Sequence, residues 1–420
     1  MIKLPKILTF YFIFIGLNAF SAKINSINFE GLTTTKPDFL IQLIQSKQNS
    51  EFDSLKLKQD EQILKNLNLF FSVQSKTKYD SLLNTIDILF LIQEAKYVYP
   101  FVAIEGINGE FKAKVGLNHI NWRGRNQTIG FLYQYYDRHS LSIYQKTPRH
   151  KNGKTGHEMA ISKYSTVEPL YFYDTTSNFN FDNYSIDLNG KYWINSKLNI
   201  DFGGMLMSEK YLQLDTLDLD LPGTSFNFFK YQLKSSITYN SVNQHYEFFD
   251  GLMLKLYLET IQTKDYPMAS FFKLKSNIKY FKRIGKNGNF GFHHNFSIAT
   301  NNFSPFAPFV LDGFINVRGI GNRVSRGTAE NIINVEYRHT ILNKKYLSLQ
   351  AIAFSDIGSL RQAGDSFESM FINNALNFYS GIGLRLHSKF FYKAIFRIDY
   401  AVNVNNFNQG GFSFGLGQFF

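Results

Sequence analysis

Cysteine is absent from this chain of 420 residues, and tryptophan and proline are scarce, with 2 and 9 copies. The absence of cysteine excludes a disulfide framework, a thiolate metal site, a cysteine nucleophile and a lipoprotein anchor. After residue 22 the sequence has no apolar run of the roughly 20 residues that a membrane-spanning helix needs. Together with a mean hydropathy of -0.20, this excludes a bundle of apolar membrane helices.

Aromatic and basic residues, in contrast, are abundant. The chain holds 25 tyrosines and 44 phenylalanines, which favour pleated, half-buried surfaces and membrane interfaces. The formal net charge is +12, but the 45 lysines and arginines are spread along the whole length. Nucleic-acid binding usually needs a concentrated basic patch or stripe. The charge therefore indicates a general surface property, and we expect no nucleic-acid partner.

The first 22 residues have the pattern of a cleaved secretory signal peptide. Two lysines precede an apolar run over residues 7–17, and small residues follow up to Ala22. An uncleaved membrane anchor is the alternative, but this run is shorter than the roughly 20 residues that span a bilayer. We therefore expect the protein to be exported.

Residues 23–96 are expected to form a small α+β domain. An extended segment ends at Gly31, and Pro37 stands where a helix would start. A second helix is predicted from leucines and an isoleucine at helical spacing, and two strands are predicted over 73–79 and 85–92. The predicted order is strand, helix, helix, strand, strand.

Residues 97–420 lose the helical period and alternate instead. Leu252, Leu254, Leu256 and Leu258 share one face of a strand, and charged residues occupy the other. A soluble β-sandwich also alternates in this way. An outward face of large apolar and aromatic residues over about ten positions, repeated in strand after strand, favours an all-β transmembrane barrel of antiparallel strands.

The connections between the predicted strands alternate between short and long, as expected of a membrane barrel with short periplasmic turns. Short joins are predicted near 137–138, 195–196, 241–245, 285–288, 343–345 and 388–389, and longer external connections near 147–156, 209–227, 263–269, 301–329, 357–376 and 404–409. An extra short strand at 168–173 is needed to keep this alternation. The result is about sixteen strands, with residues 301–329 as the sixth external loop.

No enzyme chemistry is indicated. The serine-containing segments lack the flanking glycines of a nucleophile elbow, and no histidine pair has zinc-ligand spacing in a helix. The acidic residues are numerous but scattered. We therefore predict no catalytic residue, no metal site and no cofactor.

The string LDGFINVRGIGNR is similar to the sixth-loop signature of the superfamily that includes BamA and TamA, with Val317, Arg318 and Gly319 as its VRG. The resemblance implies that the loop folds into the lumen and that its arginine pairs with acidic residues of the wall. Glu336 in NVEYR and Asp356 in AFSDIGSL are the candidates, and alternation predicts that both point inward. The alternative is a solvated Arg318 beside carboxylates that merely wet the lumen.

The N-terminal part carries a second resemblance. Its segments INFEGLTTTKPDFL and LKNLNLFFSV are similar to a single POTRA domain, the periplasmic module of outer-membrane assembly and secretion pores. An open strand edge in residues 23–94 would offer a pairing site for client chains or for periplasmic or lipoprotein partners. A rigid spacer with a solvated edge is the alternative interpretation.

The end of the chain reads as a closing strand. Phe412, Phe414, Leu416 and Phe420 are predicted to share one face, which is similar to the C-terminal signal of barrel precursors, although Gln418 departs from it. A simple interface anchor is the alternative. The first and last strands, near 111–120 and 410–420, are expected to meet at a weak seam. Glycines of the last strand would weaken it, or would only allow curvature: Gly410, Gly411, Gly415 and Gly417.

These resemblances imply a factor for outer-membrane protein assembly (insertion) or translocation. It would lie in the cell outer membrane of a Gram-negative bacterium, with the N-terminal domain in the periplasm. The expected partners are outer-membrane lipid and client outer-membrane or secreted polypeptides. A passive or polypeptide-transport pore and an inactive surface antigen are the alternatives. A single POTRA-like domain favours a specialised or accessory member.

Overall fold

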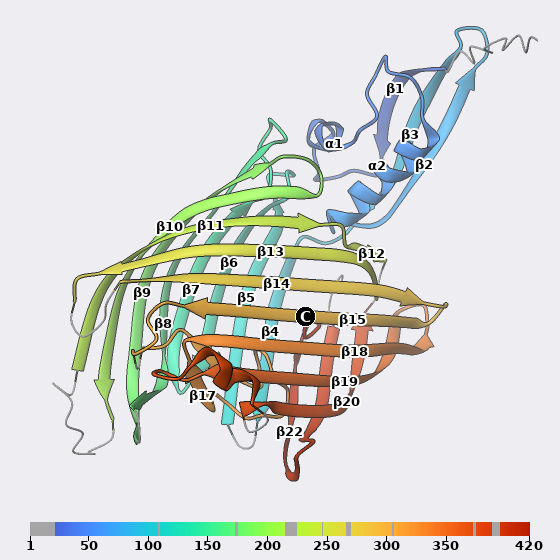
Figure 1. The fold of residues 1–420 in the computed structure, drawn as a ribbon. Coiled ribbons are helices and arrows are strands. Elements are labelled where there is room, and N and C mark those ends of the chain that lie inside the picture. The colour runs from blue at the N-terminus through green and yellow to red at the C-terminus, as the bar shows by residue number, and fades with distance from the viewer. Residues whose placement is uncertain are drawn as a thin grey trace, which may run out of the picture.

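The computed structural model describes residues 22–107, 110–172, 175–214, 225–245, 247–265, 270–304, 306–372, 375–388 and 395–420. A small domain stands at one end of a large β-barrel (Figure 1). Within those ranges no helix combines the length and apolarity that crossing a membrane requires.

The small domain has the predicted order of elements. A three-stranded sheet carries β3 in its middle, with β1 parallel and β2 antiparallel to it. Buried apolar side chains from the sheet and helices form one core, among them Ile24, Leu40, Leu64 and Phe90. The elements are β1 (Lys23–Glu30), α1 (Pro37–Leu43), α2 (Ser54–Asn66), β2 (Phe70–Asp80) and β3 (Thr85–Glu94).

The remaining strands close into one barrel of sixteen long antiparallel strands and the three-residue β12. The predicted fold class is therefore confirmed. In chain order the strands are β4 (Val98–Ile107), β5 (Glu110–Trp122), β6 (Gln127–Tyr136), β7 (Arg138–Thr147), β8 (Thr155–Phe172), β9 (Thr175–Trp193), β10 (Leu198–Gln213), β11 (Ser225–Asn240), β12 (Asn243–His245), β13 (Phe248–Thr263), β14 (Phe271–Ile284), β15 (Gly288–Ala299), β18 (Ala329–Asn343), β19 (Leu347–Arg361), β20 (Asn377–Ser388), β21 (Ile395–Asn403) and β22 (Asn406–Leu416).

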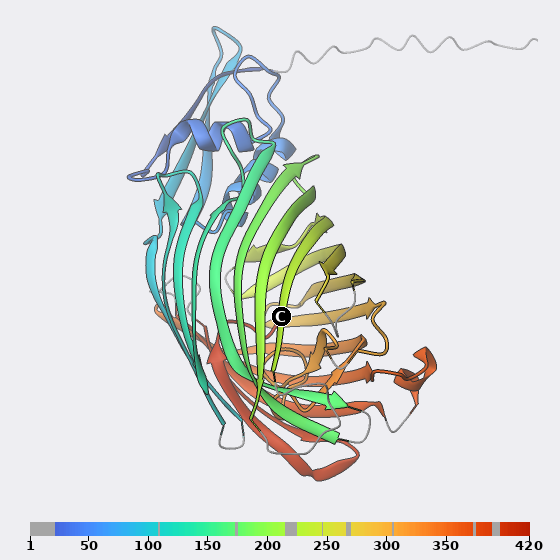
Figure 2. The same ribbon diagram turned by 90° about the vertical axis from the view of Figure 1, so that its left-hand side faces the viewer.

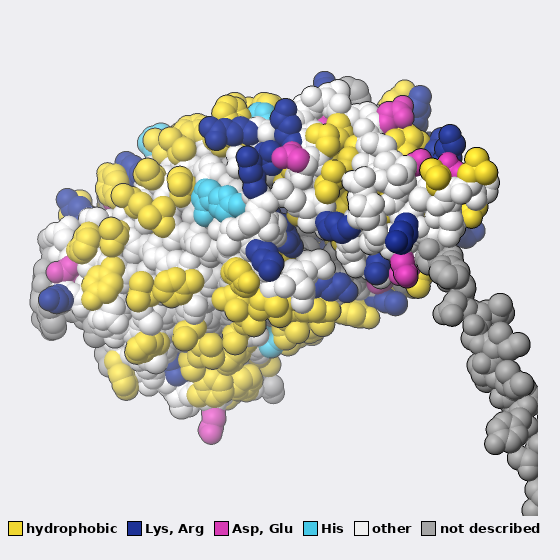
Figure 3. Space-filling model, turned by 90° about the horizontal axis from the view of Figure 1, so that it is seen from above, with side chains coloured by type: hydrophobic (Ala, Val, Ile, Leu, Met, Phe, Trp, Pro, Cys, Tyr) yellow, Lys and Arg dark blue, Asp and Glu magenta, His cyan; other side chains and the backbone are white. Residues whose placement is uncertain are grey.

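The outer wall of the barrel is apolar. On β13, Leu254, Leu256 and Leu258 are 39%, 46% and 51% exposed, while the neighbouring Glu259 is buried. Similar side chains gather over much of the wall seen in Figure 3. Because an aqueous surface rarely carries so large an apolar area, this face fits the hydrocarbon region of a bilayer.

The inventory of strands differs from the prediction in two places. The first barrel strand is β4, and the predicted first strand at 111–120 lies within β5. The extra strand expected at 168–173 does not exist as a separate element, because Glu168–Phe172 continue β8 and pair with β9; Tyr173 lies outside the described residues. β8 and β9 exceed the roughly 10 residues of a typical membrane strand. The alternation of connections required an extra strand only because β4 was missing from the prediction, so β8 was divided wrongly.

These two errors cancel in the count of strands, but they reverse the predicted direction of β5, β6, β7 and the first part of β8. The β5–β6 turn faces the small domain, because Lys36 N donates to Gly124 O at 2.9 Å. The connection at 148–154 lies at the same end, since a Cβ on Gly153 would stand 3.9 Å from Gln42 O. The turn at 137–138 therefore lies at the opposite end. The predicted external position of 147–156 and periplasmic position of 137–138 are wrong.

From β9 onward, the predicted connections lie at the same ends of the barrel as the observed ones. The connection between β15 and β18, residues 300–328, is the sixth one at the end away from the small domain. We call it loop 6. It contains the short strands β16 (Phe309–Leu311) and β17 (Ser325–Gly327), which pair with each other. The connection after β19 carries a 3-10 helix, η1 (Phe367–Phe371).

Candidate functional site in the barrel lumen

Loop 6 folds into the barrel and makes a tight turn there. Val317 is fully buried in the cluster of apolar residues inside the barrel. Backbone and side-chain hydrogen bonds fix the turn: Asp312 O accepts from the backbone nitrogens of Asn316 and Val317, and Asn316 Nδ2 donates to Val310 O at 2.8 Å. These bonds fix the backbone as far as Val317, and so they hold Arg318, which follows it, in one position.

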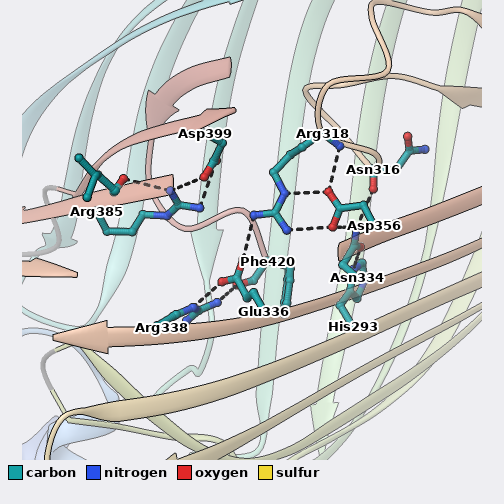
Figure 4. Close-up of polar contacts among 11 residues, drawn as sticks. His293, Asn316, Arg318, Asn334, Glu336, Arg338, Asp356, Arg385, Asp399 and Phe420 are labelled. Carbon is teal, nitrogen blue, oxygen red and sulfur yellow. Dashed lines mark hydrogen bonds and ion pairs between the residues drawn. The ribbon is translucent and has the colours of Figure 1, made fainter. Parts of the chain in front are cut away.

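Arg318 meets both predicted carboxylates (Figure 4). Its Nε and Nη2 donate to the two oxygens of Asp356 at 2.7 and 2.8 Å, and its Nη1 donates to Glu336 Oε2 at 2.9 Å. The backbone nitrogen of Arg318 adds a bond to Asp356 at 3.0 Å. All three side chains are fully buried. A forked contact with one carboxylate and a bond to a second satisfy the buried charge.

Aromatic rings enclose the same guanidinium. The Cζ atom of Arg318 lies 3.6 Å from the ring centre of Phe354 and 4.3 Å from that of Phe419. Cation–π contacts of this kind gain strength when water is excluded. Contacts with aromatic rings over the guanidinium therefore add to the hydrogen bonds at its edge.

Further ion pairs surround this centre. Arg338 pairs with Glu336 from the same strand, and Arg385 Nη1 bonds to Asp399 at 2.7 Å. Asn334 Nδ2 donates to Asp356 and to the backbone oxygen of Asn316, both at 2.8 Å. The described cluster thus balances three arginines with three carboxylates, which lowers the free energy of burying them.

The residues flanking Arg318 explain the VRG string sterically. A Cβ on Gly358 of β19 would stand 2.5 Å from Val317 Cγ2, so the glycine makes room for the valine. Gly319 has φ +83°, and a Cβ there would stand 2.8 Å from that of Ala401. A larger residue at position 319 would push the loop away from β21.

A second attachment of loop 6 was not predicted. Arg323 and Arg326 both pair with Glu168 of β8, and Arg323 also donates to Tyr164. Phe306 of the loop packs on aromatic rings of β10 and β11, with ring centres 5.0 to 5.4 Å apart: Tyr211, Phe226 and Phe228. The sequence predicts a strand at 168–173 but no contact between Glu168 and loop 6, because nothing local links the two.

The two attachments lie on different walls. In the barrel order, the strands β20, β21, β22, β4, β5, β6 and β7 stand between β19 and β8. Loop 6 therefore bridges the lumen near its outer end, from Asp356 on one side to Glu168 on the other. Parts of the loop are visible inside the curved wall in Figure 2.

The closing strand is built as predicted only as far as Leu416. Phe412 and Phe414 face outward and are 61% and 38% exposed. β22 then ends, and Gly417 turns the chain with φ +90°. The prediction that Phe420 shares this outward face is wrong. Phe420 lies inside the barrel beside Arg338. The positive φ at Gly417 is the physical reason for this departure.

The seam joins β22 to β4, so the predicted partner near 111–120 is replaced by Val98–Ile107. On its other side β22 lies close to β21: a Cβ on Gly410 would stand 2.5 Å from Ala401 O. Gly411 and Gly415 pair with Ala401 and Arg397 on the lumen face. Glycine removes side-chain packing from this strand.

The small domain is fixed to the barrel by a polar contact at the β5–β6 turn. Arg125 pairs with Asp38 at 2.5 Å, and the buried Asn121 donates to Thr35 Oγ1 at 2.8 Å. Thr35 in turn bonds to Tyr97 at 3.0 Å. On another side of the mouth, Asn66 donates to Asn243 at 3.0 Å.

Glu94 orders the loop that makes this contact, and it predicts a pH dependence. Burial works to raise the pKa of Glu94, but hydrogen bonds from Thr33, Thr34 and Thr35 outweigh burial and lower the pKa to about 2 from 4.5. Since the folded pKa is depressed, the stabilisation is complete above about pH 4.5 and is lost as the pH falls towards 2. We expect amide protection in residues 22–95 to fall over that window.

Hydrogen exchange of the full chain checks this prediction, with Glu94→Gln as the comparison. The variant should show weaker protection of residues 33–35 at pH 7 and little change between pH 4.5 and 2. Glu30→Gln serves as a control, because Glu30 is another carboxylate of the same sheet and makes none of these three bonds. If amide protection in Glu94→Gln still fell between pH 4.5 and 2 as in the wild-type chain, titratable groups other than Glu94 would cause that fall.

Comparison with protein families matches residues 22–95 to POTRA, described as a surface antigen variable number repeat, and residues 121–420 to the Omp85 superfamily domain. Comparison with curated proteins finds no match. Among solved structures, BamA from Haemophilus ducreyi lacking POTRA domains 1-3 is similar with a TM-score of 0.56 and 11% identity, covering 94% of this chain and 84% of that one.

Two further structures are similar at 12% identity. CdiB from Escherichia coli has a TM-score of 0.66 and covers 94% of this chain and 76% of its own. CdiB from Acinetobacter baumannii has a TM-score of 0.61 and covers 95% and 74%. At these identities the likeness concerns the fold alone.

Proposed function

Because the chain belongs to the Omp85 superfamily, we propose that it assembles or translocates client polypeptides at the outer membrane. The barrel fold of the superfamily implies the outer membrane of a Gram-negative bacterium. One observation carries the proposal: loop 6 is held inside the lumen by Arg318, buried between Asp356 and Glu336. A passive diffusion pore has no need of a fully desolvated ion-pair cluster on a loop that bridges its channel.

The proposed route for the client is the seam. Parting β22 from β4 would expose two unpaired strand edges, which are templates for an incoming strand. The glycines of β22 and the positive φ at Gly417 support a seam of low stability. The mechanism requires no bond chemistry and no cofactor, because pairing of main chains supplies both affinity and direction.

The small domain would act in the periplasm as a docking site. Its sheet order leaves β1 and β2 at the edges. Residues 49–52 already bond to the backbone at the start of β1, so β2 is the more open edge of the described sheet. Such an edge can add an extended segment of a client or of a periplasmic partner through main-chain hydrogen bonds. The contacts through Arg125 and Asn243 would keep this edge close to the mouth of the barrel.

Depletion of the protein in its own cell tests the proposal. We expect the outer-membrane levels of one or more other barrel proteins, or the secretion of specific polypeptides, to fall severalfold. Quantitative proteomics of outer-membrane and culture fractions measures both. Re-expression of the wild-type chain should restore the levels, and re-expression of Arg318→Ala should not. Unchanged levels of all barrel and secreted proteins after depletion would overturn the proposal in favour of an inactive surface antigen or a solute pore.

A further inference from the structure

A basic turn joins β7 to β8 at the end of the barrel that carries the small domain. Its residues 148–154 read PRHKNGK, with no acidic side chain among them. Hydrogen bonds order its backbone: His150 N donates to Thr155 O at 2.6 Å, and Gly153 N donates to His150 O at 2.9 Å. We call residues 148–154 the basic turn. Its cations stand close together on an ordered piece of backbone: Arg149, Lys151 and Lys154.

The protein itself does not neutralise the basic turn. Lys151 and Lys154 are exposed, and within the described residues no ion pair joins them or Arg149 to a carboxylate. Asp38 of the small domain lies within electrostatic reach of Lys151, but it pairs with Arg125 at 2.5 Å. An anion from outside the chain would therefore meet positive charge that has no internal partner.

Arg149 shows this lack of an acidic partner most clearly. Its guanidinium is partly buried over Trp193, with Cζ 4.0 Å from the ring centre, and its Nη1 donates to Gly153 O at 2.6 Å. Burial disfavours the charged form and no carboxylate of the described chain compensates, so the pKa of Arg149 is lowered to about 10. A guanidinium held by stacking presents a planar fork of donors, which matches the oxygens of a phosphate group.

The basic turn lies at the edge of the lipid-facing wall. On the outward face of β8, Ile161 and Met159 are 65% and 45% exposed. His157 follows them on the same face by alternation, and its ring nitrogens bond to His150 at 2.9 Å and to Gln145 at 2.7 Å. The outward face therefore changes from apolar to polar just before the turn. This change places the basic turn at the level of the lipid headgroups.

We propose that the basic turn is a binding site for the phosphate of an anionic phospholipid, in the leaflet on the side of the small domain. Arg149 binds the phosphate through its fork, and Lys151 and Lys154 add the positive charge that attracts an anionic membrane surface. The acyl chains lie along the outward faces of β7 and β8. This apolar wall favours a lipid over a soluble anion, because one molecule then contacts both surfaces. The inference goes beyond the proposed function and does not depend on it.

Native mass spectrometry of the purified protein in detergent tests the proposal. Dioleoyl phosphatidylglycerol is the anionic probe, and dioleoyl phosphatidylethanolamine is the probe without net charge. The wild-type chain should bind the anionic lipid about tenfold or more tightly than the neutral one. Lys151→Gln/Lys154→Gln should weaken binding of the anionic lipid about tenfold or more and change binding of the neutral lipid less than about twofold, because only the cations are lost.

A matched control removes the same charge from another turn. Lys344→Gln/Lys345→Gln replaces two exposed lysines between β18 and β19, at the same end of the barrel. This variant should change binding of the anionic lipid less than about threefold, because a dispersed surface charge contributes little to one site. Heat-dependent mobility in SDS gels establishes that the barrel of each variant is folded.

Hydrogen exchange of the wild-type chain in nanodiscs locates the lipid. Amides of residues 148–154 should exchange more slowly in nanodiscs of dioleoyl phosphatidylglycerol than in nanodiscs of dioleoyl phosphatidylcholine. Amides of residues 344–346 should exchange equally in both. Excess inorganic phosphate should not displace the anionic lipid, because phosphate alone gains nothing from the apolar wall.

The proposal would be overturned by equal affinities for the two lipids, or by an affinity for the anionic lipid that Lys151→Gln/Lys154→Gln leaves unchanged. An equal loss in both double variants would also overturn it, in favour of attraction by the general surface charge. Displacement of the lipid by inorganic phosphate would make the basic turn a site for soluble anions. Lipid binding requires no client polypeptide, so its outcome is independent of the depletion experiment.

Discussion

Replacing Arg318 by alanine is expected to release loop 6 from the β19 wall and to open the lumen to ions. Asp356 loses three hydrogen bonds at once, two from the guanidinium and one that depends on the position of the loop backbone. Breaking a buried pair by removing one partner costs about 3 to 5 kcal/mol. This shifts the population of released loop by a factor of about 10² to 5 × 10³.

Planar-bilayer recording of the purified protein measures this effect. The wild-type chain should show rare openings, and Arg318→Ala should show frequent ones of larger conductance. Arg385→Ala is the matched control, because Arg385 is equally buried and paired, with Asp399, but belongs to β20 and not to loop 6. Conductance that is the same in all three proteins would favour a permanently open pore.

Replacing Glu168 by glutamine should free the other side of loop 6. Glu168 is the carboxylate partner of both Arg323 and Arg326, so the variant leaves two guanidinium groups in a largely buried place with weaker acceptors. Arg326 also holds the loop through a 2.8 Å bond to Ala307 O. Losing charge-assisted bonds of this kind costs about 1.5 to 3 kcal/mol each.

Labelling of a cysteine at position 307 reports on this attachment. Ala307 is buried, and the chain has no other cysteine, so a thiol reagent reads this position alone. Adding Glu168→Gln should speed the labelling of Ala307→Cys at least about tenfold. Glu259→Gln is the control: Glu259 also serves two cations, Lys273 and Lys275, but makes none of these contacts to loop 6. An equal rate in both backgrounds would mean that Glu168 does not restrain the loop.

Local patterns were sufficient to predict the fold class and the inward direction of two acidic residues. Strand alternation fixes the face of each side chain independently of the partner strand, and Tyr337 is indeed exposed where Glu336 is buried. The sequence alone does not show how far Arg318 lies from these carboxylates. The structure supplies it, through a turn built by Asp312 and Asn316.

Features that depend on pairing between distant segments were not predictable. The ends of β8 and β9 pair with each other far beyond a typical membrane strand, and nothing local separates this from an additional strand. Glu168 and Arg323 are 155 positions apart in the chain, so no periodicity links them. The direction of residues 417–420 was misjudged for another reason: alternation continues formally to Phe420, but Gly417 adopts a positive φ and ends the strand.

Disulfide crosslinking tests the position of loop 6 most directly. Val317 Cγ2 lies 2.5 Å from where a Cβ on Gly358 would stand, so cysteines at 317 and 358 fall within disulfide range. We predict that Val317→Cys/Gly358→Cys, oxidised in the membrane, forms the bond in most molecules, while Val317→Cys/Ile357→Cys, with its second cysteine on the opposite face, does not. Two free thiols in the first variant, both labelled by a membrane-impermeant maleimide, would contradict a loop held in the lumen.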